Sequence, residues 1–322
     1  MLTETLRKLL NAAMLLLAVL VLNFSLIHAA PGDPVEALVG EMGGATPEMI
    51  ADLRSQFGLD QPLYVQIGTY LGRVLQGDLG HSLYYDQPVT QLIAERIGPT
   101  LLLVTTSLLS AIILGTLLGI FSAQNRQSIL SHLVTVIALA GFSAPVFWVG
   151  IMLILLLSVS IPLLPISGMS SSEGAGTGFS HMLDVLHHLI LPSLTLALIY
   201  LAFYSRLSRA SMLEVLGSDY VRTARAKGLP RRLVIYKHAL RNAVLPVVTF
   251  AGLQFGQVIS GAVLVETVFA WPGLGTLAFD SILRRDTPTL LGILFFSALM
   301  VVAMNLLTDV IYRRIDPRIN NK

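Results

Sequence analysis

Six stretches of the chain contain no aspartate, glutamate, lysine or arginine, and each is long enough to cross a membrane as a helix. They comprise 24, 29, 46, 21, 24 and 22 residues, and they run over Leu9–Gly32, Ile97–Asn125, Gln127–Ser172, Val185–Ser205, Asn242–Val265 and Thr287–Thr308. A bilayer core needs about 20 apolar residues in a helix, which satisfies its own backbone hydrogen bonds. The sequence therefore predicts an all-α integral membrane protein with six transmembrane helices. In the third stretch, Pro162 and Pro165 predict one span that ends near Ile161 and is followed by a loop.

The composition excludes a soluble enzyme. Only 12% of the 322 residues are charged, which is about half the fraction found in soluble domains, so the chain lacks the residues for a water-facing surface. A formal net charge of +2 does not indicate a nucleic-acid partner. The absence of cysteine excludes disulfides, thiolate nucleophiles, iron–sulfur clusters and thiolate zinc sites.

The positions of the cations predict the orientation in the membrane. With a cytoplasmic N-terminus, 16 of the 21 lysines and arginines lie on the cytoplasmic side and 5 on the other, as the positive-inside rule requires. Both termini are therefore predicted to be cytoplasmic. The first stretch could instead be a cleaved signal peptide, but it is long for one, and His28 stands where cleavage requires a small residue. We interpret it as a retained helix.

The first loop outside the cytoplasm is long enough to fold. Residues 31–96 carry nine acids and three arginines. Thr46 and Pro47 predict the start of a helix that ends at Phe57 before Gly58, and a second helix is predicted over residues 62–76. We expect a folded cap here, with a dedicated ligand site as the alternative. The predicted domains are residues 1–96, a transmembrane helix with its cap loop, and residues 97–322, a five-helix core.

The cytoplasmic loop over residues 206–241 has a pattern typical of a helical hairpin. Ser218 or Asp219 can cap a helix, Gly228 can end it in the left-handed conformation, and Pro230 can begin another. One side of the first helix carries small residues and the other sides are basic; the small ones are Thr223, Ala224 and Ala226. Small residues allow another surface to approach, and arginine pairs with carboxylates. The hairpin therefore predicts a docking site, with a basic loop that touches only lipid headgroups as the alternative.

The sequence contains none of the common nucleotide-binding or metalloprotease motifs. None of the four lysines follows a glycine, so there is no P-loop, and there is no His-Glu-x-x-His. Asp184 with His187 or His188 is the one set at helical ligand spacing, and we expect no metal there. Ion-coupled carriers need ionisable groups inside their spans, whereas Glu266 and Asp309 lie at span ends. The chain can form a path but has no energy source of its own.

Neutral polar residues in the fifth span are the candidates for that path. Gln254, Gln257 and Ser260 recur every three residues, and the two amides share one helix face, as expected for a wet pore or a helix–helix hydrogen bond. The spacings Gly115-x-x-x-Gly119 and Gly252-x-x-x-Gly256 predict close helix packing.

Several motifs in this chain resemble those of ABC importer permeases of the dipeptide, oligopeptide and nickel family. They are Pro31–Pro34, Gly58–Pro62, Gly77–Ser82, Asp219–Leu229, His238–Ala243, Leu245–Pro246, Phe269–Gly275 and Asp316–Arg318. The likeness covers essentially the whole chain in order. Where the broad importer pattern has Glu-Ala, this chain has Arg222 and Thr223, which resembles the peptide and nickel branch. A contact made through that glutamate is therefore not implied.

The resemblance implies a type I permease subunit of an ATP-driven importer in the bacterial inner membrane, with no enzymatic activity of its own. A second six-helix permease would complete the path, and an extracytoplasmic binding protein would deliver the substrate. Two cytoplasmic ATPase subunits would bind ATP and magnesium, and the chain itself would hold no cofactor. The residues at or beside the element that docks on the ATPase would be Thr223, Ala224, Arg225, Ala226, Lys227, Gly228, Leu229 and Pro230.

The segment after the fifth span is a candidate outer gate. Pro272 and Gly273 break the helix next to Phe269 and Trp271, so aromatic side chains would lie at the mouth of the path. The alternative is an interfacial tryptophan anchor.

The resemblance favours di- and oligopeptides as substrates, with nickel, metal chelates and glutathione as alternatives. Two other functions are possible: a self-sufficient channel or secondary carrier, and a membrane anchor or sensor that docks a signalling protein. The lack of charge inside the spans argues against the first, and the whole-chain resemblance argues against the second.

Overall fold

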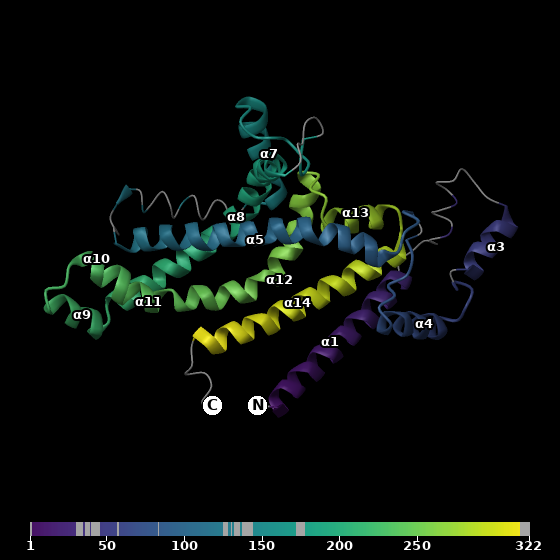
Figure 1. Ribbon diagram of the computed structural model, residues 1–322, viewed down its shortest axis with the longest axis horizontal. Coiled ribbons are helices and arrows are strands. Elements are labelled where there is room, and N and C mark those ends of the chain that lie inside the picture. The colour runs from purple at the N-terminus through teal and green to yellow at the C-terminus, as the bar shows by residue number, and fades with distance from the viewer. Residues whose placement is uncertain are drawn as a thin grey trace. The chain divides into compact units, whose positions relative to one another are not determined.

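The computed structural model describes residues 2–29, 35, 39, 46–56, 58–82, 84–124, 128, 129, 131, 136, 144–171 and 178–315. Within these residues the secondary-structure elements are all helices (Figure 1), which confirms the all-α class. The chain divides into two compact units. The first comprises Met1–Gly98 and Gly273–Ala303, and the second comprises Pro99–Pro272 and Met304–Lys322.

Three helices of the described part are long and apolar enough to cross a membrane. They are α5 (Val89–Gln124), α8 (Phe179–Leu216) and the Thr287–Leu306 part of α14 (Thr287–Ile315). These helices cover the second, fourth and sixth predicted spans. Helices α1 (Leu2–Ala29) and α12 (Leu245–Val268) lie over the first and fifth, and a total of six spans stays a prediction.

The structure describes the second half of the third predicted span. Helix α7 (Val146–Ile154) continues as the π-helix η1 (Leu155–Ser160). The helix ends at Ile161, whose backbone is extended, where the two prolines predicted an end. Most of residues 125–143 lie outside the described residues.

In the first unit, two short helices form where the cap was predicted. Helix α3 (Pro47–Gln56) begins with the N–H of Met49 donating to Thr46 Oγ1 at 3.3 Å, and Gly58 follows with φ +66°. Helix α4 (Leu63–Leu75) packs on α1, where the Tyr70 ring stacks on Phe24 at 5.6 Å. Burial raises the pKa of Tyr70 to about 12. Both helices are confirmed to within one residue at each end.

A second contact area of the first unit joins α13 (Leu274–Leu283) to the starts of α5 and α14. Its buried core residues are Val89, Leu92, Ile93, Leu274, Leu277 and Ile293. No pattern in the sequence predicted α13. Its first turn is closed by Thr276, whose hydroxyl donates to the Gly273 carbonyl at 2.8 Å and accepts from the Gly273 N–H at 3.1 Å.

The core of the second unit lies between α5, α7, α8 and α12. Helices α5 and α8 approach closely enough to exclude side chains. A Cβ placed on Gly119 would lie 2.5 Å from the Ser205 carbonyl oxygen, and one on Gly115 would lie 2.8 Å from Tyr204 Cβ. Real Cβ contacts of this length do not occur, so the predicted close packing at these two glycines is confirmed.

Candidate functional site

The predicted hairpin is present in the second unit, directly after α8. Helix α9 (Asp219–Ala226) is followed by α10 (Arg231–Leu233), the π-helix η2 (Val234–Ala239) and α11 (Leu240–Ala243). Gly228 has φ +76°, and its N–H donates to the Arg225 carbonyl at 2.9 Å. The N–H of Leu229 donates to the Ala224 carbonyl at 3.4 Å. These two bonds are the helix ending that a left-handed glycine permits, as predicted.

The predicted side-chain cap of α9 is wrong. Ser218 occupies the N-cap position, but its hydroxyl donates to the Val215 carbonyl at 2.6 Å, and no side chain caps this helix. Asp219 is the first helical residue, and its carboxylate pairs with Arg222 at 3.6 Å on the surface. Ser218 therefore ties the start of α9 to the end of α8.

An apolar cluster supports the hairpin from below. It comprises Ile120, Ala123, Met212, Val221, Ala224, Val234, Ile235, Ala239 and Ala243, from α5, α8, α9, η2 and α11. The Arg231 guanidinium also reaches the Gln124 carbonyl at 3.5 Å. The turn therefore rests on the ends of two long helices of its own unit.

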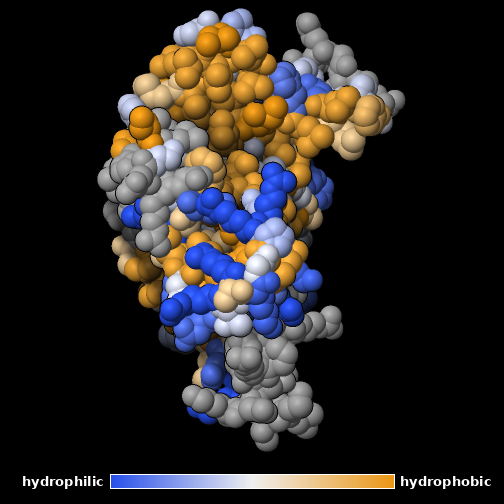
Figure 2. All heavy atoms as spheres, turned by 90° about the vertical axis from the view of Figure 1, so that its left-hand side faces the viewer, coloured by the Kyte–Doolittle hydropathy of each residue, from blue (hydrophilic) through white to orange (hydrophobic). Residues whose placement is uncertain are grey.

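The outer surface of the hairpin is polar and basic. Figure 2 views the molecule from the side where α9 and α10 lie, and hydrophilic side chains gather there. Six of the eight predicted docking residues are exposed: Thr223, Arg225, Ala226, Lys227, Gly228 and Pro230. Ala224 is buried in the cluster below and Leu229 is half-buried. The expected face of three small residues is thus a face of two, because Ala224 points inward with Val221.

Three of the four predicted gate residues are buried, and the fourth is half-buried. Trp271 is 0% exposed and Phe269 is 2% exposed. The Trp271 indole N–H donates to the Pro99 carbonyl at 2.9 Å, and the Phe269 carbonyl accepts from the Gly168 N–H at 2.8 Å. Gly273 is buried and Pro272 is half-buried. An interfacial tryptophan would expose its ring edge, and this one does not.

A buried carboxylate next to this segment was not recognised as a contact from the sequence. Glu266 is 0% exposed and accepts a hydrogen bond from Thr100 Oγ1 at 2.7 Å. Its backbone carbonyl accepts from the Trp271 N–H at 2.8 Å. Together with the Trp271–Pro99 bond, these contacts join residues 266–271 to Pro99 and Thr100, which are adjacent in α5.

The predicted path residues lie on α12. Gln254 is half-buried, whereas the side chains of Gln257 and Ser260 lie outside the described part of the structure. Their positions in the helix keep the predicted spacing of three residues.

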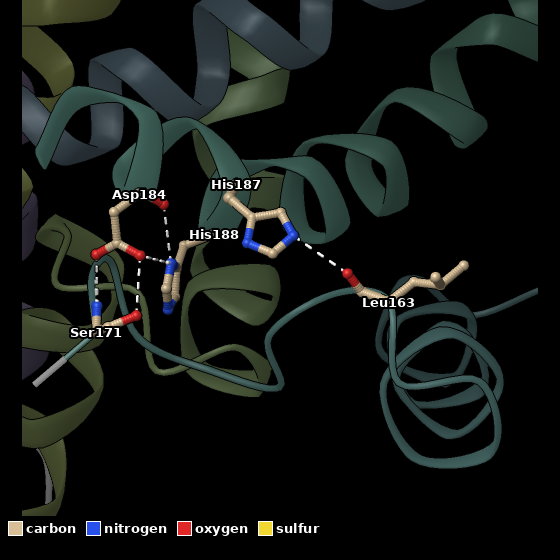
Figure 3. Close-up of polar contacts among 5 residues, drawn as sticks. All are labelled: Leu163, Ser171, Asp184, His187 and His188. Atoms are coloured by element: carbon tan, nitrogen blue, oxygen red, sulfur yellow. Dashed lines mark hydrogen bonds and ion pairs between the residues drawn. The ribbon is translucent and has the colours of Figure 1, made fainter. Parts of the chain in front are cut away.

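The histidines at the start of α8 are separated by their hydrogen bonds (Figure 3). Asp184 pairs with His188 at 3.3 Å and accepts bonds from the Ser171 N–H and hydroxyl at 2.7 and 2.9 Å. His187 turns away, and its Nε2 lies 3.1 Å from the Leu163 carbonyl. Among the described residues, no group of three histidine or acidic side chains is placed to hold a metal ion.

A recess of about 440 Å³ lies between α5 and α8, and His187 is part of its lining. Its lining is Thr106, Leu183, Leu186, His187, Leu189, Ile190 and Ser193. These residues offer neither a carboxylate nor a guanidinium group, so the recess contains no ion-pairing partner of either kind for the charged ends of a peptide.

Two family models match the chain, and together they span almost all of it. The model described as the binding-protein-dependent transport system inner membrane component matches residues 115–321. The model of the N-terminal region of the same components matches residues 1–104. The chain belongs to the family of binding-protein-dependent transport system inner membrane components. This confirms the resemblance to ABC importer permeases.

Relatives with 41–42% identity match this transport component over nearly their full lengths. The dipeptide transport system permease protein DppB of Escherichia coli K12 is 42% identical, over 95% of each chain. The di/tripeptide transport system permease protein DppB of Pseudomonas aeruginosa is 42% identical, over 94% of each. The glutathione transport system permease protein GsiC of Salmonella paratyphi A is 41% identical, over 100% of each.

A solved structure shares the fold. The MetNI methionine ABC transporter in an inward-facing conformation matches with a TM-score of 0.57 and 17% identity, over 70% of this chain and 97% of the other. The likeness supports a type I importer permease fold. The component is thus a multi-pass protein of the bacterial inner membrane and not an enzyme. Its family implies ATPase and substrate-binding partners.

Proposed function

We propose that this chain is one of two permease subunits that together form the path of a peptide importer. The observation that carries the proposal is the 42% identity to a dipeptide permease over 95% of both chains. Di- and oligopeptides delivered by a soluble binding protein are the substrate class. Glutathione, itself a small peptide, is the second candidate, because GsiC matches over the whole chain at 41%.

The proposed topology has six spans and two cytoplasmic termini. It is supported by the three long apolar helices and by the 16 of 21 cations that this orientation places inside. Residues 1–96 supply the first span and a cap, and residues 97–322 supply a five-helix core. Two ATPase subunits bind ATP and magnesium, and this chain holds no cofactor.

The hairpin is the proposed contact with an ATPase subunit. The exposed residues Thr223, Arg225, Ala226, Lys227, Gly228 and Pro230 make the contact, and Ala224 and Leu229 support it from below. Two features support this role: the charge of the hairpin surface and its packing on two long helices. The hairpin surface is basic, and its underside is packed on the ends of α5 and α8, so a force on the turn reaches both helices.

The proposed transport cycle follows from this connection. Closure of the ATPase pair on ATP draws two such hairpins together and opens the path outward, and hydrolysis resets the path inward. Gln254, Gln257 and Ser260 line the path. Phe269, Trp271, Pro272 and Gly273 close its outer end, and the burial of both aromatic rings supports a closed gate.

The test is affinity purification of the tagged chain in mild detergent, followed by mass spectrometry and uptake assays. We expect a second six-span permease and ATPase subunits to co-purify. We also expect ATP-dependent uptake of labelled dipeptide by the reconstituted complex, with competition by unlabelled dipeptides. Competition by glutathione alone would identify glutathione, and not dipeptides, as the substrate. A stable homo-oligomer with ATP-independent flux would contradict the importer.

A further inference from the structure

Helix α13 of the first unit has one face that its own unit does not cover. Leu274, Leu277 and Ser281 pack inward. On the other side Phe279 is 42% exposed, Ile282 is 58% exposed and Leu283 is 68% exposed. Three large apolar side chains thus point away from the unit.

The sequence position of α13 places this face beside the membrane. Leu283 is followed after three residues by Thr287, where the spanning helix α14 begins. The C-terminal end of α13 therefore lies at the depth where a span begins. Helices with one apolar face at this depth lie in the plane of the membrane, with the apolar face buried below the headgroups.

Two arginines follow the apolar face directly. Arg284 and Arg285 are both exposed. Arg285 has φ +56°, in the left-handed region. Its N–H donates to the Ile282 carbonyl at 3.3 Å, and the N–H of Asp286 donates to the Ser281 carbonyl at 2.9 Å. Glycine normally occupies the left-handed position of this helix ending, so the backbone alone does not explain an arginine there.

The turn that carries the arginines is held firmly. Asp286 is 1% exposed and accepts hydrogen bonds from the hydroxyls of Ser82 and Thr289. The Arg284 Cζ lies 3.6 Å from the centre of the Tyr84 ring. The Arg284 guanidinium is therefore held on the Tyr84 ring, and the backbone that carries the exposed Arg285 is anchored by Asp286.

We propose that α13 is an interfacial helix that binds phospholipid. Phe279, Ile282 and Leu283 enter the acyl-chain region, and Arg284 and Arg285 bind headgroup phosphates. Guanidinium groups bind phosphate oxygens in a bidentate geometry. The acyl chains of a phospholipid cover the apolar face while its phosphate pairs with the arginines. A water-soluble partner would leave the apolar face exposed to water whenever it dissociates. This role is independent of the substrate of the importer.

The first test measures the depth of α13. The chain contains no cysteine, so Leu283→Cys introduces a unique position for a nitroxide spin label. The full chain is placed in nanodiscs of phosphatidylethanolamine and phosphatidylglycerol. We expect this label to be relaxed by oxygen and protected from a water-soluble nickel chelate. Ser55→Cys on the polar helix α3 is the matched control and should show the reverse.

Two outcomes of this measurement overturn the proposal. One is a Leu283→Cys label that is as accessible to the nickel chelate as the Ser55→Cys label. The other is a label that becomes protected only when the cognate binding protein or the second permease subunit is added, which would assign the apolar face to a protein.

The second test addresses the arginines. Native mass spectrometry of the full chain released from these nanodiscs counts the phosphatidylglycerol molecules that stay bound. We expect the occupancy to fall about fivefold for each arginine removed, in Arg284→Gln and Arg285→Gly. Arg73→Gln, on the exposed side of α4, is the control and should retain the wild-type count. Glycine suits the left-handed backbone, so misfolding does not explain a loss in Arg285→Gly.

Unchanged lipid occupancy in both variants would overturn the assignment of the arginines. Added inorganic phosphate should not displace the lipid. Displacement would show that the turn is a site for free phosphate, and this too would contradict the proposal.

Discussion

The turn after α9 and the turn after α13 share one backbone geometry but carry different residues at the position that requires it. Gly228 has φ +76° and Arg285 has φ +56°. In each turn, the left-handed residue and the residue after it donate to two carbonyls of the preceding helix. Glycine adopts this conformation freely, whereas a residue with a Cβ is strained by roughly 1–2 kcal/mol.

The difference teaches how each turn is used. At Gly228 nothing lies within 4 Å of the place where a Cβ would be, so no neighbour in the chain forbids a side chain. The left-handed backbone explains the glycine, and the open space around it leaves the turn accessible to a partner. At Arg285 the chain accepts backbone strain and keeps a cation, so the side chain itself has a use.

The largest expected effect is on transport, from a charge placed on the smooth turn. Gly228→Glu should lower ATP-driven uptake by the reconstituted complex about tenfold or more, because an unpaired carboxylate in a buried contact costs several kcal/mol. Gly228→Ala introduces the same strain without the charge and should retain most of the uptake. Equal uptake in the wild type and the glutamate variant would remove the hairpin from the ATPase contact.

The second effect is on the stability of the other turn. Asp286→Ala should lower the free energy of unfolding by about 2–3 kcal/mol, because two buried hydroxyls lose their acceptor and α14 loses its N-cap. Thermal unfolding of the purified chain in detergent measures this. The control is Asp219→Ala on the hairpin, where the carboxylate is 98% exposed, and it should shift the free energy by less than about 0.5 kcal/mol. Similar losses in both variants would mean that Asp286 has no special part in holding its turn.

A third effect has opposite signs in the two turns. Arg285→Gly should stabilise the fold by about 1 kcal/mol, because strain is relieved, and Gly228→Arg should destabilise it by about the same amount. The same unfolding assay compares both with the wild type. If Arg285→Gly destabilises the fold, the arginine makes a stabilising contact that outweighs its strain.

The smallest effect is expected at the start of α9. Ser218→Ala should change the free energy of unfolding by less than about 0.5 kcal/mol, because the hydroxyl bonds the end of α8 and leaves the first turn of α9 uncapped. A loss of 1 kcal/mol or more in the same assay would show that the bond to the Val215 carbonyl stabilises the junction of α8 and α9.

The sequence predicted features that depend on neighbouring residues. The ends of α3 and α9 follow from Gly58 and Gly228, since a left-handed glycine is a local signal. The close approach of α5 and α8 follows from two glycines four residues apart. The inward direction of Ala224 could also have been predicted from the sequence, because Val221 three residues earlier marks the buried face of the same helix.

Features that depend on distant residues could not be predicted from one sequence. Glu266 and Thr100 are 166 residues apart, and Asp286 and Ser82 are 204 apart, and no local pattern pairs them. Helix α13 has only ten residues, too short for a clear apolar period. Its end could have been predicted in part, because Asp286 before Thr-Pro-Thr is a typical beginning of the next helix.

The contact of α5 and α8 at Gly115 and Gly119 has a mechanical consequence. Helix α8 has 38 residues and is therefore about 57 Å long. Its last turns contribute Met212 to the cluster beneath the hairpin, and residues 201–209, in its C-terminal half, pack against the two glycines of α5. If α8 pivots at this contact, its far end at Phe179 lies about 39 Å from Ser205, and a tilt of about one degree displaces that end by about 0.7 Å. A methyl group added at Gly119 would push α5 and α8 apart at this contact.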